Sequence, residues 1–161
     1  MARCVTVKAA SPAVWGMSVE LPFAPVDSII RRNAGELRVS AEAAEELARR
    51  IQERGAARAE TAAERATADG RKTLMAADFE APVVDKDRLE LPVAPVDRIA
   101  RLDIDDRYRV SMDARIALAG ELESYADTVA AAAAILARHA DRRTAKAEDV
   151  ETYYELEPYF E

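Results

Sequence analysis

The chain has 161 residues, of which 50% are hydrophobic and 33% are charged, and its formal net charge at pH 7 is −7. One cysteine excludes an internal disulfide, and no apolar run approaches the roughly 20 residues that a membrane span needs. We therefore expect a cytoplasmic protein without a membrane partner.

Two halves of the sequence repeat each other with a period of 70 to 71 residues. A half of about 60 residues is marginal as an independent module, and packing the two halves together removes that difficulty. We therefore favour one domain of two halves over two separate modules. Three pairs of segments match in order: LPFAPVDSIIR (21–31) with LPVAPVDRIAR (91–101), RVSAEAAEELA (38–48) with RVSMDARIALA (109–119), and GRKTLMAAD (70–78) with DRRTAKAED (141–149).

The repeat divides the chain into five parts. Residues 1–20 form an amino-terminal arm for which we find no counterpart before the second copy. Met17 stands directly before the lead-in to the first copy, so the residues upstream are either a flexible arm or an over-extended reading frame. The other parts are the first unit (21–80), a linker (81–90), the second unit (91–156) and an acidic tail (157–161).

Each unit predicts a short, a long and a short helix. Pro25 and Pro95 fit the first turn of a short helix. Ser40 and Ser111 then fit the N-cap of a long helix of about 40 Å, at a rise of 1.5 Å per residue. A last short helix follows in each copy, and Pro82 is expected to cut the first of these short.

The apolar faces of the two long helices differ in bulk. A lean, alanine-rich stripe opposite a bulkier one suits two antiparallel helices that cross closely, so we expect one shared core. The lean stripe consists of Ala44, Leu47, Ala48, Ile51, Ala59, Ala62, Ala63 and Ala66, and the bulky stripe of Ile116, Leu118, Ala119, Leu122, Tyr125, Val129, Ala133 and Leu136.

The order LPxAP, RVS and (G/D)R(K/R)TxxAxD, found twice, resembles the archaeal histone family. The chain is similar to an end-to-end histone doublet of a halophilic archaeon, and the resemblance covers about residues 21–79 and 91–156. It implies an all-α protein whose two histone folds clasp in an intramolecular handshake to form a pseudo-dimer. It also implies binding and wrapping of double-stranded DNA.

The second loop of each copy contains an arginine and an aspartate seven residues apart, Arg71 with Asp78 and Arg142 with Asp149. An ion pair at this spacing would clamp the loop onto the start of the third helix, as the matching pair does in the family. The alternative is two unrelated surface charges, worth under ~1 kcal/mol.

The resemblance assigns DNA contacts to both loops of each copy. Arginine ahead of a helix N-terminus can enter a minor groove while backbone amides and hydroxyls bind phosphates. On the first helices Arg31, Arg32, Arg98 and Arg101 are further candidates, although a merely solvated face explains these nearly as well. The matched loop residues are Arg38, Lys72, Thr73, Arg109, Arg143 and Thr144.

The acidic balance argues against affinity for phosphate, but most of the acidic excess lies outside the repeats. Residues 21–79 carry ten basic and ten acidic side chains, and residues 91–150 carry nine and eleven. Four lysines accompany 19 arginines, a profile typical of a salt-loving cytoplasm. At ~1 M ionic strength the Debye length is ~3 Å, so attraction and repulsion are both screened and we expect weak, dynamic binding.

His139 is the only histidine, so neither a metal cluster nor histidine-dependent catalysis has support in the sequence. We expect no enzyme, no metal and no cofactor. Leu136, His139 and Asp149 match the family's contact between dimers, whereas the first copy has Arg65 and Ala68 in place of the first two. We therefore expect two chains to pair through the second unit.

The function that these patterns favour is a DNA-binding histone that bends or wraps duplex DNA with little sequence specificity, on the chromosome, in chromatin organisation or transcription regulation. The alternative is a histone-fold interaction module of a transcription complex that binds protein partners through its acidic tail and does not touch DNA.

Overall fold

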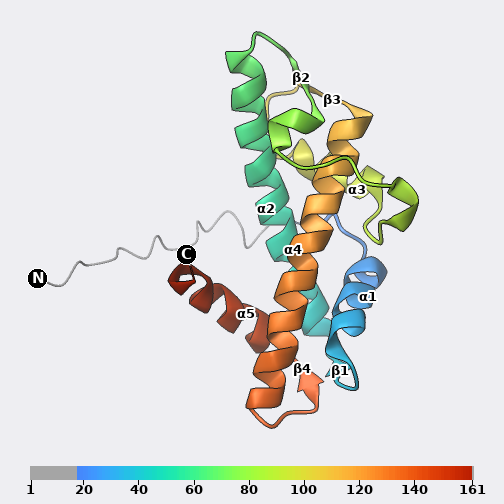
Figure 1. Cartoon of the computed structure of the whole chain (residues 1–161), viewed down its shortest axis with the longest axis vertical. Coiled ribbons are helices and arrows are strands. Elements are labelled where there is room, and N and C mark those ends of the chain that lie inside the picture. Colours follow the sequence, from blue (N-terminus) through green and yellow to red (C-terminus); the bar gives the residue numbers. More distant parts are fainter. Residues whose placement is uncertain (1–17, 161) are drawn as a thin grey trace, which may run out of the picture.

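The computed structural model describes residues 18–160, which form two interlocked halves of one helical plan (Figure 1). Our hypotheses about Met17 and the residues before it lie outside this part of the chain. The first half contains α1 (Phe23–Ala34), β1 (Arg38–Val39), α2 (Ala41–Ala68), β2 (Thr73–Leu74) and the 3-10 turn η2 (Ala76–Phe79), and η3 (Lys86–Arg88) lies in the linker. The second half contains α3 (Val93–Ala100), β3 (Arg109–Val110), α4 (Met112–His139), β4 (Thr144–Ala145), α5 (Ala147–Leu156) and η4 (Glu157–Tyr159).

The predicted short-long-short plan is confirmed, and so are the caps of the long helices. The Ser40 hydroxyl accepts a hydrogen bond from the backbone N–H of Ala43 at 3.1 Å, and Ser111 caps α4 through Ala114 at the same distance. Each cap satisfies a backbone donor that a helix N-terminus leaves free. Gly35 ends α1 with φ at 61°, a conformation that glycine adopts without strain.

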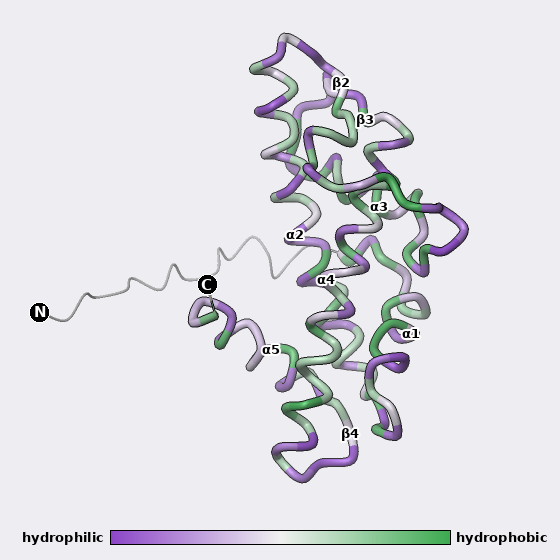
Figure 2. Tube along the Cα trace, in the orientation of Figure 1, coloured by the Kyte–Doolittle hydropathy of each residue, from purple (hydrophilic) through white to green (hydrophobic). Residues whose placement is uncertain are grey.

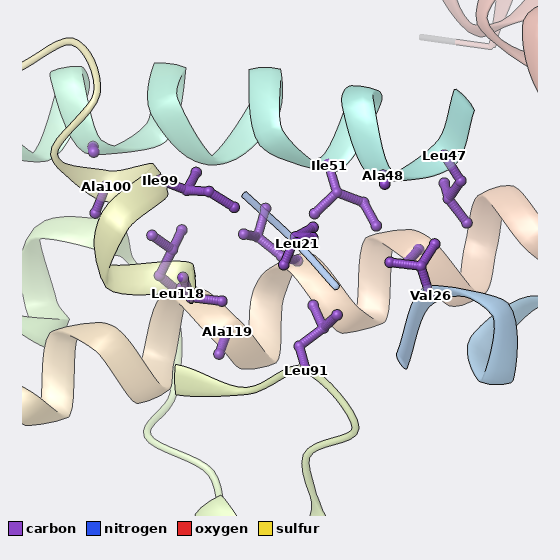
Figure 3. Packing of buried hydrophobic residues seen from close by; sticks show 14 of the residues in the cluster. Leu21, Val26, Leu47, Ala48, Ile51, Leu91, Ile99, Ala100, Leu118 and Ala119 are labelled. Atoms are coloured by element: carbon purple, nitrogen blue, oxygen red, sulfur yellow. The ribbon is translucent and has the colours of Figure 1, made fainter. Parts of the chain in front are cut away.

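The core lies where α2 and α4 cross in antiparallel directions, as the contrasting apolar stripes predict. Figure 3 shows Leu47, Ala48 and Ile51 of α2 facing α4, with Leu21 and Leu91 between the two helices. Gly55 permits the close approach: a Cβ there would lie 2.7 Å from Cγ2 of Ile99 and 3.0 Å from Cδ1 of Leu122. The helices therefore touch through a position that has no side chain.

Short parallel strands join the halves at the two ends of this crossing. β1 of the first half pairs with β4 of the second, and β2 pairs with β3. The first loop of each half thus lies beside the second loop of the other, at opposite ends of the elongated molecule (Figure 1). This crosswise pairing is the predicted intramolecular handshake.

The lead-ins to the two first helices are held in the same way. The Glu20 N–H donates to Oε1 of Gln52 on α2 at 2.7 Å, and the Glu90 N–H donates to Oε1 of Glu123 on α4 at 2.5 Å. Gln52 and Glu123 occupy equivalent positions of the repeat. We expected residues 1–20 to have no counterpart in the second copy, but Glu20 has one in Glu90.

The halves differ most after the second loop. In the second half α5 packs against both α2 and α4, whereas η2 in the first half is only four residues long. Pro82 lies three residues beyond η2, in agreement with the predicted early stop. Residues 80–90 instead run over α4, where Val84 lies against Gly120. None of the described helices combines the length and the apolar character needed to cross a bilayer.

Gly55→Val tests the helix crossing. Its branched side chain would push into Ile99 and Leu122, and we expect the free energy of unfolding to fall by about 2–3 kcal/mol. Ala57→Val, at an exposed position of the same helix, is the control and is expected to cost less than about 0.7 kcal/mol in helix propensity. Denaturant unfolding followed by circular dichroism measures both variants. Equal losses would mean that Gly55 does not set the crossing.

Candidate nucleic-acid interface

The β1/β4 end, which comprises residues 35–40 and 138–146, brings three predicted DNA-binding residues together. The Arg38 backbone N–H donates to the carbonyl of Arg143 at 2.8 Å, and Arg38 stands opposite Thr144 in the strand register. The side chains of Arg38 and Arg143 are exposed or half-buried, and Thr144 is half-buried. One residue from the first half and two from the second therefore share this surface.

The β2/β3 end, which comprises residues 67–75 and 102–111, is the equivalent arrangement in the other direction. The Arg109 N–H donates to the carbonyl of Lys72 at 2.9 Å, and Thr73 stands opposite Arg109. Arg109 is exposed, and Lys72 is half-buried. The N-terminus of a long helix lies behind each end, so its positive dipole adds to the loop charges.

The arginines of the first helices are engaged by carboxylates. Arg31 pairs with Asp27 at 2.7 Å, Arg98 with Glu20 at 3.1 Å and Arg101 with Asp97 at 3.2 Å. Arg32 forms two hydrogen bonds with Asp127, at 2.8 and 2.7 Å. A phosphate that binds here must displace an existing partner, so these four side chains are weaker candidates than the loop residues.

The cations of residues 18–160 that have no carboxylate partner gather at the two ends. Thirteen of the 21 lysines and arginines in this range form an ion pair with a carboxylate, and eight do not. Seven of the eight lie at the ends, where Figure 2 shows hydrophilic chain, and only Lys86 lies elsewhere. The seven are Arg38, Lys72, Arg107, Arg109, Arg138, Arg143 and Lys146.

Three members of this set escaped the sequence analysis. Lys146 lies within the second-loop motif and Arg107 stands just before the RVS motif, and this proximity was the available signal. Arg138 lies in the last turn of α4, and its place at the β1/β4 end depends on a hydrogen bond to the carbonyl of Ala34 at 3.0 Å. No local pattern in the sequence indicates that contact.

Both predicted arginine–aspartate pairs are in contact. Arg71 Nη2 lies 2.7 Å from Oδ1 of Asp78, and a second hydrogen bond of 2.9 Å joins Nη1 to Oδ2. Arg142 binds Asp149 in the same two-pronged manner. Each aspartate also accepts the backbone N–H three residues before it, from Met75 and Lys146. The hydrogen bonds from Arg71 hold the pKa of Asp78 below its usual range.

The residues predicted to join two chains lie on the second half with different exposures. His139 is exposed, Leu136 is half-buried and Asp149 is only 2% exposed. Ile135 is 63% exposed and stands one turn before His139, a position that the sequence analysis overlooked. The equivalent positions of the first half are the charged residues Glu64 and Arg65. Among residues 18–160, no group of three or more His, Cys, Asp or Glu side chains is placed to hold a metal ion.

Two short-long-short units whose loops pair crosswise define a histone-fold pseudo-dimer within one chain. A family model described as "histone-like transcription factor (CBF/NF-Y) and archaeal histone" matches residues 19–83 and again residues 89–152. The chain belongs to this family, and it does so twice over. The family is not one of enzymes.

Individual relatives agree with this assignment. The chain is similar to the archaeal histone HAN1 of Thermococcus zilligii, with 54% identity over 61 residues, which is 38% of this chain and 88% of that protein. The crystal structure of the histone from Methanopyrus kandleri matches with a TM-score of 0.63 and 27% identity, over 81% of this chain and 91% of that chain. One chain there therefore matches both halves here. A crystal structure from Thermus thermophilus with 15% identity and a TM-score of 0.64, over 87% and 98% of the two chains, shares the fold alone.

Asp78→Asn tests the clamp. We expect it to lower the free energy of unfolding by about 2 kcal/mol, since the buried carboxylate accepts three hydrogen bonds at once. Asp69→Asn removes the exposed partner of the same Arg71 and is expected to cost less than about 0.5 kcal/mol. Denaturant unfolding at pH 7 measures both variants.

The clamp also predicts a pH dependence. The pKa of Asp78 is lowered in the folded state, so its stabilisation is present above its unfolded pKa of ~3.9 and is lost as the pH falls through the folded pKa. The stability gap between wild type and Asp78→Asn should therefore be full at pH 7 and shrink below pH ~4. A gap independent of pH would contradict the clamp.

Proposed function

We propose that this chain binds double-stranded DNA as a histone doublet, bending or wrapping it with little sequence specificity on the chromosome. The observation that carries the proposal is the concentration of unpaired cations at the two loop ends of an otherwise acidic molecule. Membership of a family that includes the archaeal histones supports it. Organisation of chromatin and regulation of transcription are both compatible with this activity.

The proposed contacts are to the DNA backbone. Arg38 and Arg109 each stand just before a serine-capped helix N-terminus, and Thr144 and Thr73 lie opposite them. Arginine placed in this way can insert into a minor groove while hydroxyls, amides and neighbouring cations take phosphates. Such contacts read the width of the groove and not the identity of the bases. Two such ends on an elongated molecule would touch the duplex at two places and favour a bend.

The net charge of −7 fits a protein that works in concentrated salt. At ~1 M salt the field of the distant carboxylates is screened within ~3 Å, so only the composition of the ends themselves affects binding. Each phosphate contact also loses strength as salt rises. We propose a halophilic origin and weak, exchangeable binding on this basis.

A protein partner is the second candidate function. Tyr159 and Phe160 are 82% and 72% exposed at the end of the acidic tail, and Leu156 is 38% exposed. Exposed aromatic side chains among carboxylates are typical of a peptide that docks on another protein. On this alternative the ends would not touch DNA.

Charge reversal at both ends separates these functions. We expect Arg38→Glu/Arg109→Glu to weaken binding to a mixed-sequence duplex at least about tenfold, because each reversal removes a phosphate contact and adds repulsion. Lys86→Glu/Arg88→Glu makes the same change in net charge on the linker and is the matched control. Fluorescence anisotropy from low to molar KCl measures binding, and circular dichroism verifies the fold at each salt. Absence of binding by folded wild type would favour the protein-partner function.

We also propose that two chains pair through the second half. The oxygens of Asp149 already accept hydrogen bonds from Arg142 and Lys146, so His139 of a second copy would find little free surface on this carboxylate. Ile135 and Leu136 would then supply most of the contact as apolar surface. The charged Glu64 and Arg65 at the equivalent site disfavour pairing through the first half. Pairing would therefore stop at two chains.

Sedimentation velocity in molar KCl tests this pairing. Wild type should sediment as two chains, and Ile135→Glu/His139→Ala as one, since a buried carboxylate without a partner opposes association. Thr128→Glu, an exposed change two turns earlier on the same helix, should leave the pair intact. Long polymers or a strictly single chain for wild type would overturn the proposal.

A further inference from the structure

A hollow of about 940 Å³ opens at the β1/β4 end. Arg38, Arg138, Arg143 and Thr144 line it together with Gly35 and Glu36. None of the three arginines forms an ion pair with a carboxylate of residues 18–160. Three guanidinium groups around one concave surface have the charge and the donors to hold a phosphate.

The position of Arg138 is fixed by the fold. Its Nη2 donates to the carbonyl of Ala34 at 3.0 Å, across 104 residues of sequence, and this bond ties the last turn of α4 to the end of α1. Gly35 makes room for it, since a Cβ at that position would lie 3.2 Å from Nη2 of Arg138. The guanidinium is therefore held at the hollow before any ligand arrives. A donor held in advance loses less entropy on binding than a free side chain.

The β2/β3 end lacks this arrangement. The residue equivalent to Arg138 is Thr67, whose hydroxyl lies 2.5 Å from the hydroxyl of Tyr108. The residue equivalent to Lys146 is Met75, which is 48% exposed. An aromatic contact and an apolar side chain thus occupy places that carry positive charge at the other end.

The acidic residues strengthen the contrast. Four cations without a carboxylate partner at the β1/β4 end, Arg38, Arg138, Arg143 and Lys146, face two such acids, Glu36 and Asp141. Three at the β2/β3 end, Lys72, Arg107 and Arg109, face three acids, Asp103, Asp105 and Asp106. Close like charges repel phosphate directly, and salt screens them less than it screens distant charges.

We propose that the two ends of the pseudo-dimer bind DNA unequally. The β1/β4 end is the strong one, and Arg138 completes a three-arginine phosphate site there. The β2/β3 end makes the weaker contact and releases first as salt rises. This inference rests on the proposed DNA binding and adds a direction to it, so that a doublet lies on the duplex in one orientation relative to its own strong end.

Paired substitutions at equivalent positions test the inequality. Anisotropy titration of a mixed-sequence duplex at 0.2 M KCl, with the fold verified by circular dichroism, compares Arg138→Gln with Thr67→Gln and Arg38→Gln with Arg109→Gln. Loss of one phosphate contact reduces the salt slope by about 0.9, which corresponds to about fourfold in affinity at this salt. We expect that loss for Arg138→Gln and no change for Thr67→Gln. Arg38→Gln should weaken binding at least about threefold more than Arg109→Gln.

Arg138→Lys separates charge from structure. Lysine keeps the positive charge while it loses the planar hydrogen bond to Ala34, so this variant should retain most of the affinity that Arg138→Gln loses. If both variants weaken binding alike, Arg138 acts by holding α1 and the phosphate site is overturned. Equal losses for Arg38→Gln and Arg109→Gln overturn the inequality and leave the proposed DNA binding standing. A folded wild type that never binds overturns both proposals.

Discussion

The antiparallel crossing of α2 and α4 determines how the rest of the structure is arranged. A helix of 28 residues with an apolar stripe along its length needs a partner of the same length, and each half supplies the partner of the other. Because the helices run in opposite directions, the start of each lies beside the end of the other. The loops before and after them must then meet crosswise, which produces the β1/β4 and β2/β3 pairs. The candidate DNA surface is thus a consequence of how the core is buried.

Covalent linkage of the halves frees them to differ. A dimer of identical chains has two equal ends, since symmetry repeats each residue. Here the first half ends in the short turn η2 and a linker over α4, whereas the second ends in α5 packed against both long helices. The same freedom allows Arg138 opposite Thr67 and Lys146 opposite Met75. A tandem chain can therefore give its two ends, and its two halves, different tasks.

The sequence predicts features whose causes are local or repeated. Ser40 and Ser111 cap helices because of their immediate neighbours, and Arg71 finds Asp78 seven residues away. It does not predict contacts between residues that only the fold brings together. Arg32 meets Asp127 across 95 residues, and Arg138 meets Ala34 across 104. Such contacts decide which arginines are engaged and which remain available, so the sequence alone could not separate the arginines of the loops from those of the first helices.

The charge of the whole chain is a poor guide to what its surface binds. Many carboxylates near the arginines of the helical body are joined to them in ion pairs, as Asp27, Asp97 and Glu121 show. Those pairs present little field to a phosphate because the opposite charges lie within a few ångströms of each other. Nearly all the unpaired cations of residues 18–160 lie at the two ends, where the handshake places them. Salt that screens the acidic tail and linker leaves contact pairs at these ends largely intact, so an acidic protein retains two cationic ends at the salt concentrations where its distant carboxylates cease to matter.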